Sequence, residues 1–231
     1  MKIGAFDINT ITKNDCMKAM PLMPSNSVDL ILTDIPYGNV SKNGEERAKY
    51  SGQLRKLDKE DADVETFDLI EFLDECYRLL KGSIYIFCGI EQMSTVFDYF
   101  DSKTDMTTRQ CIWHKTNPSP VNGQHYWIHA IENCVYAKKR KTTFNQHCKH
   151  NVWDFPAGRG KIHPTQKPLG LFKYLIESST FEGEVVFDPC IGSGTTAVAA
   201  RELNRQYIGF DISEEYVGKA NERLSAIHIA K

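Results

Sequence analysis

The chain has 231 residues, of which 41% are hydrophobic and 25% charged, and its formal net charge is −2. These values are typical of a globular protein, and no stretch approaches the ~20 consecutive apolar residues of a membrane helix. The N-terminus has no signal-peptide core, and the seven cysteines include no C-x-x-C pair, which argues against a disulfide framework and a zinc ribbon. We expect one cytoplasmic domain over residues 1–231, with no membrane association and no bound metal.

Apolar segments predict the strands of this domain, at residues 7–12, 28–34, 83–89, 108–115, 131–138, 184–189 and 206–211. Helical patterns lie between several of them, at 66–81, 168–180, 195–203 and 213–227. Gly82 predicts the end of the first helix, and Ser213 the beginning of the last. This alternation indicates an α/β fold, with a doubly wound, mostly parallel, seven-stranded sheet and helices on both faces.

Two stretches interrupt the alternation. Residues 39–62 are polar and charged and predict a long flexible loop, and residues 116–161 contain irregular segments that predict a small insertion. The basic run at 138–141 is more typical of a solvated surface than of a nucleic-acid contact. The segment 147–150 (H-C-K-H) lacks a second ligand pair and does not predict a metal site.

A glycine-containing segment follows the strand predicted at 184–189. Gly192, Gly194 and Ala197 match the G-x-G-x-x-A spacing of a dinucleotide-binding turn, in which glycine allows a ligand to approach the backbone closely. A tight strand-to-helix turn without a ligand has the same pattern. The spacing alone leaves both interpretations open.

Asp211 ends the next predicted strand, at the position where an acidic side chain accepts hydrogen bonds from ribose hydroxyls. The alternative is a carboxylate at the N-terminus of the helix that begins near Ser213. Together, the glycine turn and Asp211 predict an adenosine-type ligand. They do not distinguish NAD from other nucleosides.

A second group of candidate functional residues lies at the end of the strand predicted at 28–34. It consists of Asp34, Ile35, Pro36 and Tyr37. The exocyclic amine of adenine or cytosine is a poor nucleophile, because its lone pair is delocalised into the ring. The Asp34 carboxylate and the Ile35 carbonyl, each accepting one amine hydrogen, would favour a tetrahedral nitrogen. Pro36 restricts Ile35 to extended angles, and Tyr37 offers a ring on which a base stacks. A strand-ending turn with a capping aspartate and a core tyrosine is the alternative.

These segments, in this order, resemble the S-adenosylmethionine-dependent DNA amino-methyltransferases of the permuted group, whose catalytic motif precedes the cofactor motif. Residues 34–37 are similar to the family's D-P-P-Y loop, residues 188–196 to its D-P-F-x-G-S-G-T-T loop, and residues 163–168 to its H-P-T-Q-K-P segment. Further matches at 74–82, 112–115 and 215–224 extend the resemblance over nearly the whole chain. It implies a Rossmann-like methyltransferase fold, circularly permuted.

The resemblance assigns roles to individual residues. Asp34, Pro36 and Tyr37 would be catalytic. S-adenosylmethionine would be held by Asp15, Thr165, Lys167, Asp188, Cys190, Gly192, Ser193, Gly194, Thr195 and Asp211.

Within this set, Asp188 and residues 192–195 would cradle the methionine and sugar, and Asp211 would bind ribose. Asp15 would reach the adenine amine, and Thr165 and Lys167 would lie near the methionine carboxylate. Asp15 also has the pattern of a helix cap, and Lys167 that of a solvated lysine before a helix.

Two positions depart from the family pattern. Ile35 replaces the usual first proline, which adds a backbone N–H and is expected to loosen the loop. Cys190 replaces the usual phenylalanine and is expected to weaken contact with the cofactor. An aspartate at the first loop position favours adenine as the target, because the cytosine-modifying relatives more often have serine there.

The resemblance implies a site-specific adenine DNA methyltransferase of a prokaryote or phage, of the kind found in restriction–modification. Its partner would be double-stranded DNA with the target base flipped out of the helix, and a homodimer is compatible with the sequence. Residues 116–128 and 139–161, aided by 39–62, are the candidates for target recognition. Trp113, Trp127 and Trp153 are more typical of a core than of base stacking. A cytosine-specific enzyme, an NAD-dependent oxidoreductase and an inactive DNA-binding module are the alternatives.

Overall fold

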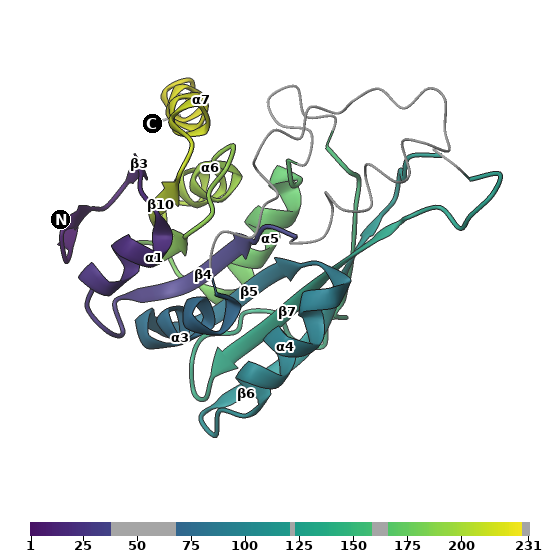
Figure 1. The fold of residues 1–231 in the computed structure, drawn as a ribbon, viewed down its shortest axis with the longest axis horizontal. Coiled ribbons are helices and arrows are strands. Elements are labelled where there is room, and N and C mark those ends of the chain that lie inside the picture. Colours follow the sequence, from purple (N-terminus) through teal and green to yellow (C-terminus); the bar gives the residue numbers. More distant parts are fainter. Residues whose placement is uncertain (38–67, 121–122, 159–165, 228–231) are drawn as a thin grey trace.

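The structure, a computed structural model, describes residues 1–37, 68–120, 123–158 and 166–227. These residues form a large sheet of eight strands in the order β3-β10-β9-β4-β5-β7-β6-β8 and a separate pair β1-β2 (Figure 1). The large sheet contains β3 (Thr10–Lys13), β4 (Val28–Asp34), β5 (Leu80–Cys88), β6 (Met106–Lys115), β7 (Ile131–Lys139), β8 (Val152–Phe155), β9 (Val185–Asp188) and β10 (Gln206–Asp211). The pair consists of β1 (Lys2–Ile3) and β2 (Phe6–Asp7).

The mostly parallel sheet is confirmed, because only β7 runs antiparallel to its neighbours β5 and β6. Its size was predicted wrongly, since the described sheet has eight strands and not seven. The additional strand is β8, which comes from a segment without apolar periodicity and pairs with β6 at the edge. Such a strand is defined by its neighbour, so the sequence pattern contains little signal for it.

Helices cover both faces of the sheet, as predicted. One face is covered by α1 (Cys16–Ala19), the short 3₁₀ helix η1 (Met20–Leu22), α3 (Leu69–Leu79) and α4 (Ile90–Asp101). The other face is covered by α5 (Leu169–Ser179), α6 (Thr195–Glu202) and α7 (Glu214–Ser225). None of the helices in the described part of the chain has both the length and the apolar character needed to cross a membrane.

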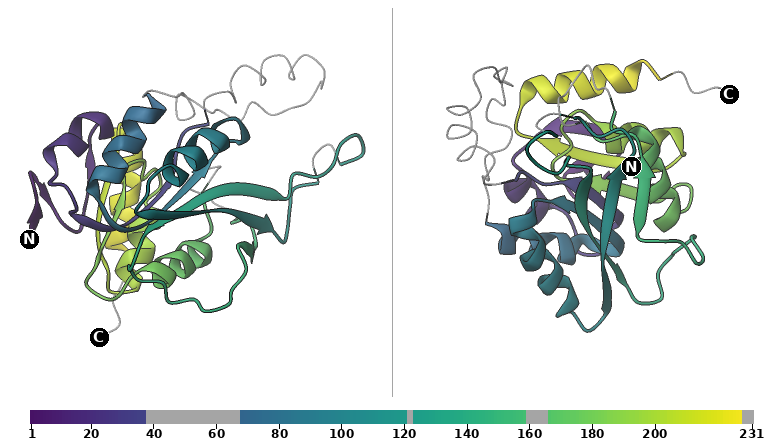
Figure 2. Two further views of the ribbon diagram at one scale, coloured as in Figure 1. Left: turned by 90° about the horizontal axis from the view of Figure 1, so that it is seen from below. Right: turned by 90° about the vertical axis from the view of Figure 1, so that its right-hand side faces the viewer.

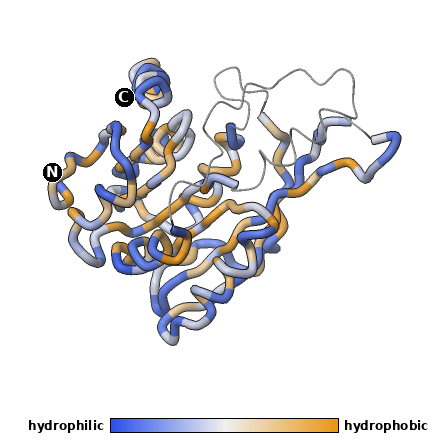
Figure 3. Tube along the Cα trace, in the orientation of Figure 1, coloured by the Kyte–Doolittle hydropathy of each residue, from blue (hydrophilic) through white to orange (hydrophobic). Residues whose placement is uncertain are grey.

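The two hydrophobic cores explain why β4 is a continuous apolar run. Ile31 packs into the core beneath α3 and α4, whereas Leu30 and Leu32 pack into the core beneath α5 and α6. All three side chains are fully buried, so both faces of the strand need apolar residues. Figure 3 shows hydrophobic residues along the central strands.

The first predicted helix ends earlier than Gly82. Helix α3 ends at Leu79, and Gly82 lies inside β5. A side chain at Gly82 would lie 2.2 Å from the carbonyl oxygen of Asp29, where the pairing of β4 with β5 is irregular. Gly82 therefore permits close approach of two strands and does not terminate the helix.

Strands β4 and β9 are parallel neighbours whose following helices leave in opposite directions. From β4 the chain crosses through α3 to β5 on one side, and from β9 it crosses through α6 to β10 on the other. This is a topological switch point, and ligands bind in the crevice outside the carboxyl ends of the strands at such a point. The predicted Asp34 and glycine loops both lie at this crevice.

Strands β6 and β7 continue beyond the sheet as an arm of residues 116–130, of which 121–122 are not described. Figure 2 shows the arm projecting from the body of the molecule. The arm follows the end of β6 and precedes the start of β7, and β6 runs in the same direction as β5. It therefore projects from the same edge of the sheet as the Asp34 loop.

Candidate active site

Four aspartates follow or end adjacent strands at one edge of the sheet. Asp34 ends β4, Asp188 ends β9 and Asp211 ends β10, while Asp15 lies just beyond β3. The parallel pairing of these strands aligns the four positions side by side. Of the ten cofactor residues predicted from the sequence, Thr165 lies outside the described residues, and the described ones lie at this edge, in the loops or at the ends of the elements beside them.

Residues on β5 and α4 hold the Asp34 loop in place. The Ile35 N–H donates to the carbonyl of Phe87 at 3.1 Å, and the Ile35 side chain is buried. The Gln92 side chain donates to the carbonyl of Pro36 at 2.9 Å and accepts from the Gly89 N–H at 3.0 Å. The expectation that Ile35 loosens the loop is therefore wrong, because its additional N–H extends the hydrogen bonding between β4 and β5.

The Asp34 carboxylate contacts two side chains in the structure. Its Oδ1 accepts a hydrogen bond from the Tyr37 hydroxyl at 2.8 Å, and its Oδ2 contacts the Lys167 ammonium. Burial raises the pKa of Asp34, and Lys167 offsets part of that effect. Burial and the neighbouring Asp34 raise the pKa of Tyr37 well above its usual value, so Tyr37 stays a neutral hydrogen-bond donor.

Lys167 lies between two carboxylates, because its Nζ contacts Asp34 and lies 3.0 Å from Oε2 of Glu132. Oε1 of Glu132 lies 2.7 Å from Nζ of Lys115. Burial opposes the charge on Lys167, yet the two carboxylates outweigh it and raise the pKa of this lysine. Burial likewise opposes the charge on Glu132, but the two lysines lower its pKa.

Because its side chain is only 6% exposed, Lys167 is not the solvated lysine that the alternative interpretation describes. Removing one partner of a buried pair leaves an uncompensated charge and costs about 3–5 kcal/mol. The ion pair between Lys167 and Asp34 therefore holds the segment before α5 against the Asp34 loop.

Asp188 and the glycine loop form the other side of the crevice. The Asp188 carboxylate accepts from the Thr196 hydroxyl at 2.5 Å and from the Cys190 N–H at 3.1 Å. It is 3% exposed, and burial raises its pKa to about 7. Such a carboxyl readily changes its charge when a ligand approaches.

The two loop glycines have different functions. Gly192 has a φ of +48°, and a side chain there would meet nothing within 4 Å, which leaves open space in front of the backbone. Gly194 has a φ of +78°, and a side chain there would lie 2.8 Å from the Cβ of Ala220 on α7. Gly192 provides room for a ligand, and Gly194 permits close packing of α7.

Arg223 on α7 stabilises the glycine loop. Its guanidinium donates to the Ser193 carbonyl and to the Thr195 hydroxyl, both at 3.1 Å. With its amide turned so that the oxygen faces the guanidinium, Gln166 accepts from the same arginine at 2.9 and 3.0 Å. Arg223 therefore connects the glycine loop with the segment that carries Lys167.

Asp211 and Asp15 have hydrogen bonds that match the alternatives considered for them. Asp211 accepts from the Gly192 N–H at 3.0 Å and from the Ser213 N–H at 2.8 Å. Asp15 caps α1 by accepting from the Met17 N–H at 3.0 Å. Neither arrangement excludes a ligand, since a carboxylate has about four acceptor positions. Their contacts with a cofactor stay predictions.

Three residues of this site were missed by the sequence reasoning. Gln92 and Arg223 act through side-chain contacts between segments far apart in the chain, for which a single sequence has no pattern. Glu132 has a weak signal, because it is a charged residue at the beginning of the apolar strand predicted at 131–138. Its partner Lys115 ends the preceding predicted strand.

The candidate recognition segments are divided between the two edges of the sheet. Lys139 at the end of β7 donates to Asn26, which precedes β4, so the basic run at 138–141 lies at the edge opposite Asp34. The arm, in contrast, exposes Tyr126 (76%) and Trp127 (100%). The expectation of a core position holds for Trp113 and Trp153, which are buried, and is wrong for Trp127.

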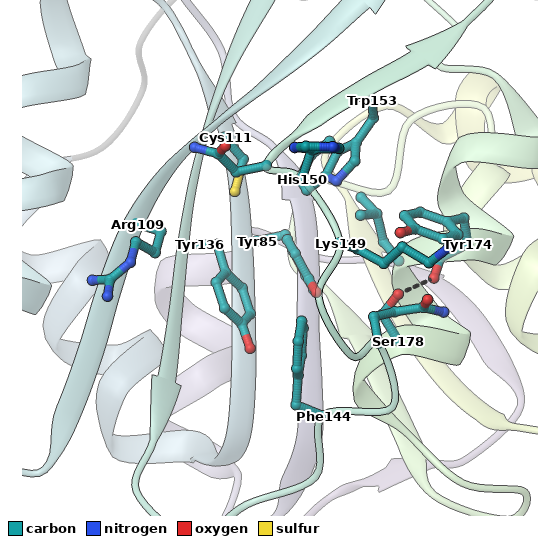
Figure 4. A pocket seen from close by; sticks show the side chains of 13 residues that line it. Tyr85, Arg109, Cys111, Tyr136, Phe144, Lys149, His150, Trp153, Tyr174 and Ser178 are labelled. Atoms are coloured by element: carbon teal, nitrogen blue, oxygen red, sulfur yellow. Dashed lines mark hydrogen bonds between the residues drawn. The ribbon is translucent and has the colours of Figure 1, made fainter.

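A cavity of about 320 Å³ lies elsewhere, on the sheet face beneath residues 144–151 (Figure 4). Aromatic rings of Tyr85, Tyr136, Phe144 and Trp153 contribute to its lining. It contains none of the predicted catalytic or cofactor residues, and part of its lining comes from the recognition segment predicted at 139–161. Among the residues that the structure describes, no group of three or more side chains is arranged to hold a metal ion.

The features of the crevice fit S-adenosylmethionine. Gly192 leaves open space beside the loop, and acidic side chains suited to amino and hydroxyl groups lie on both sides of it. The cofactor would occupy the ends of β9 and β10, next to the Asp34 loop.

Comparisons with known proteins agree with this geometry. A family model described as DNA methylase matches residues 28–222. The Type II methyltransferase M.HinfI of Haemophilus influenzae is 34% identical, over 95% of this chain and 69% of that protein. M2.DpnII of Streptococcus pneumoniae, also a Type II methyltransferase, is 30% identical, over 94% of this chain and 89% of that protein.

Two solved structures have similar folds. The M1.HpyAVI–SAM complex superimposes with a TM-score of 0.70 and 26% identity, over 93% of this chain and 98% of that one. The cytosine-N4-specific PvuII DNA methyltransferase superimposes with a TM-score of 0.72, over 95% of this chain and 87% of that one. At 16% identity, the second likeness concerns the fold alone.

Proposed function

Because this chain belongs to the DNA methylase family, we propose that it transfers a methyl group from S-adenosylmethionine to the exocyclic amino group of adenine at a specific DNA sequence. One observation carries the proposal. The Asp34 loop and the glycine loop end the adjacent parallel strands β4 and β9, so a base on one loop would face a cofactor on the other. We also assign the chain to the permuted group, because the Asp34 loop precedes the glycine loop in the sequence.

Asp34 and Ile35 would activate the target amine. The carboxylate accepts one amine hydrogen and the Ile35 carbonyl accepts the other, which directs the nitrogen lone pair toward the crevice. The Gln92 contact with Pro36 keeps this carbonyl in place, and the Tyr37 ring stacks on the base. Since the target must leave the helix at a cost of a few kcal/mol, stacking worth about 1–3 kcal/mol offsets part of it.

The bound cofactor supplies an electrophilic methyl group on a sulfonium sulfur. The methyl carbon would exchange its bond to sulfur for a bond to the amine nitrogen in line, and Asp34 would accept the amine proton along their hydrogen bond. No covalent bond to the protein is needed. Burial raises the pKa of Cys88 to about 12 and that of Cys134 well above its usual value, so these thiols beside Asp34 are protonated and not nucleophilic. Much of the rate would come from positioning and water exclusion.

The cofactor would lie along the glycine loop. Asp188 and residues 192–195 would contact its methionine and sugar, Asp211 its ribose and Asp15 its adenine. Thr165 and Lys167 would approach the methionine carboxylate, which is supported for Lys167 by its contact with Asp34 at the same edge of the sheet.

DNA would approach the edge from which the arm projects. Trp127 and Tyr126 offer exposed rings there, whereas the basic run at 138–141 lies at the opposite edge. Among the described candidates we therefore propose the arm and residues 152–158, since β8 runs parallel to β6 and ends at the same edge. The candidate segment 39–62 lies outside the described residues. Cytosine N4 is the alternative target, because the geometry of an amine held by Asp34 and Ile35 serves either base.

The decisive experiment is the transfer of tritiated methyl groups from S-adenosylmethionine to assorted duplex DNAs, followed by nucleoside analysis and sequencing of the modified sites. N6-methyladenine at one sequence is expected; N4-methylcytosine would select the alternative base. DNA retention without methyl incorporation at saturating cofactor would indicate an inactive binding module. A thermal shift with NADH and none with S-adenosylmethionine would favour an oxidoreductase.

Asp34→Ala tests the role of the carboxylate directly. We expect methyl transfer to fall below detection while cofactor affinity, measured by calorimetry, stays within about threefold, because the Asp34 side chain bonds to Tyr37 and Lys167 and not to the glycine loop. Full activity in this variant would show that Asp34 does not orient the amine.

A further inference from the structure

We propose that Glu132 is a positioning residue for this methyl transfer. When the amino group of the target base takes the place of the Lys167 ammonium on Asp34, Glu132 keeps that ammonium paired. The inference rests on the proposed function and adds a residue that lies outside the motifs at 34–37, 163–168 and 188–196.

The carboxylate that is proposed to bind the target amine already has two partners. Tyr37 occupies Oδ1 of Asp34 at 2.8 Å, and Lys167 contacts Oδ2. The side chain of Asp34 is 27% exposed, so a base can reach it from the crevice. We infer that the amine hydrogen takes the place of the Lys167 ammonium on Oδ2, while Tyr37 keeps its hydrogen bond to Oδ1.

Lys167 cannot move into water to make room, because its side chain is 6% exposed and packs beneath the rings of Tyr37 and Phe87. A buried ammonium needs a carboxylate partner. Glu132 is that partner, since its Oε2 lies 3.0 Å from Nζ of Lys167. Lys167 can release Asp34 without losing its neutralising charge.

Lys115 completes the arrangement from the other side of Glu132. Its Nζ lies 2.7 Å from Oε1, so Glu132 is oriented with Oε2 toward Lys167. In the unliganded state two lysines and two carboxylates alternate in a row from Lys115 to Asp34. When the target amine binds Asp34, the Lys115–Glu132–Lys167 part of the row stays intact.

The ionisation of Asp34 provides a measurable consequence. The titratable groups facing it are Tyr37 on its own loop, Cys88 on β5, Glu132 and Cys134 on β7, Lys167 before α5 and Asp188 on β9. Of these, Glu132 raises the pKa of Asp34, and Lys167 lowers it. The acid limb of the pH–rate profile is the range in which the rate falls as Asp34 becomes protonated. Replacing Glu132 and replacing Lys167 should therefore shift this limb in opposite directions.

Glu132→Gln is the first test. Asp34 then remains the single carboxylate of the described residues that pairs with Lys167, so Lys167 should hold Asp34 more tightly and exclude the amine. We expect the single-turnover rate at saturating cofactor to fall about tenfold, which corresponds to one pKa unit of interaction. The acid limb of the pH–rate profile should move to lower pH.

Two variants and a binding assay separate positioning from general damage. Lys167→Gln should move the acid limb to higher pH, and Glu132→Asp, which keeps the charge, should recover most of the rate. A duplex with 2-aminopurine at the target position, bound with S-adenosylhomocysteine, should show a smaller fluorescence increase with Glu132→Gln than with the unchanged protein. Glu75→Gln, which breaks a half-buried ion pair to Arg78 on α3, is the matched control and should change none of these values.

The outcomes distinguish this inference from the proposed function. If the unchanged chain methylates DNA and Glu132→Gln has the same rate and acid limb, Glu132 has no positioning role. A loss of cofactor affinity in Glu132→Gln, measured by calorimetry, would also overturn the inference. If Glu132→Gln does not fold, Lys167→Gln provides the test. The inference is overturned if the acid limb of this variant is unchanged or shifted to lower pH. Failure of the unchanged chain to methylate any DNA would instead refute the proposed function.

Discussion

Asp188 shows how burial at the crevice affects a single carboxyl group. It is 3% exposed at the end of β9, and its pKa is raised from 3.8 to about 7 by burial, against the hydrogen bonds from Thr196 and Cys190. Between these two pH values the folded chain keeps a proton that the unfolded chain releases. The stability of the folded state therefore decreases as the pH rises from about 4 to about 7, and the loss is complete above the folded pKa.

Asp188→Asn should remove this pH-dependent cost, because an amide of the same shape has no charge to bury. We compare the melting temperatures of Asp188→Asn and the unchanged chain in the absence of cofactor. The difference between them, variant minus unchanged chain, should increase from pH 5 to pH 8 by an amount equivalent to a few kcal/mol of folding stability. Thermal unfolding at both pH values measures this difference. A constant difference across this pH range would show that Asp188 is already ionised in the folded chain.

The sequence identified some residues of the candidate site and missed others. The Asp34 and glycine loops were recognised because their residues are contiguous. Gln92, Glu132 and Arg223 were missed, since each acts on a segment more than twenty positions away in the chain. Lys167 was expected near the cofactor, yet its contact with Asp34 depends on how the segment before α5 crosses the sheet.

At the scale of elements, the glycine loop and α7 are packed without space for a side chain. Gly194 has a φ of +78° and lies under Ala220, which is fully buried on α7. Arg223 on the same helix bonds to the loop on either side of Gly194. The position of α7 and the shape of the glycine loop are therefore coupled.

Gly194→Ala should displace α7 and disturb the loop. We expect it to destabilise the chain by about 2–4 kcal/mol, from positive-φ strain of about 1 kcal/mol and overpacking of about 1–3 kcal/mol, and to weaken cofactor binding. Gly183→Ala is the matched control, because Gly183 has a φ of +80° but nothing within 4 Å of the added atom. Denaturant unfolding of both variants measures the two costs; equal losses would show that α7 accommodates the methyl group.

For the whole molecule, the arrangement of the two edges of the sheet determines which surface DNA can use. The crevice and the arm lie at the carboxyl edge, and the basic run at 138–141 lies at the other. The chain has a net charge of −2, so attraction to DNA depends on local groups more than on the total charge. Exposed rings on the arm are the distinctive feature of the edge that faces DNA in this proposal.

Trp127→Ala should weaken DNA binding without affecting the fold. Because Trp127 is fully exposed, its removal leaves no cavity, whereas the loss of one stacking contact is worth about 1–3 kcal/mol, or about 5- to 150-fold in affinity. Fluorescence anisotropy with the methylated sequence measures the affinity, and thermal unfolding checks the fold. Phe181→Ala removes a ring that is 57% exposed after the end of α5, away from the arm, and should leave DNA affinity unchanged. Equal affinities for both variants would exclude the arm ring from DNA contact.

The sequence by itself determined the fold class, most strands and helices, and the two loops that are proposed to hold the target base and the cofactor. These features have local causes: apolar runs for buried strands, a serine cap at Ser213, and contiguous motifs at 34–37 and 188–196. Only the tertiary structure decided that β8 exists, that Gly82 lies in a strand, that Trp127 is exposed and that Lys167 bridges Asp34 and Glu132. Each of these depends on a neighbour distant in sequence, and the physical forces involved, burial and charge pairing, act through space and leave no periodic pattern along the chain.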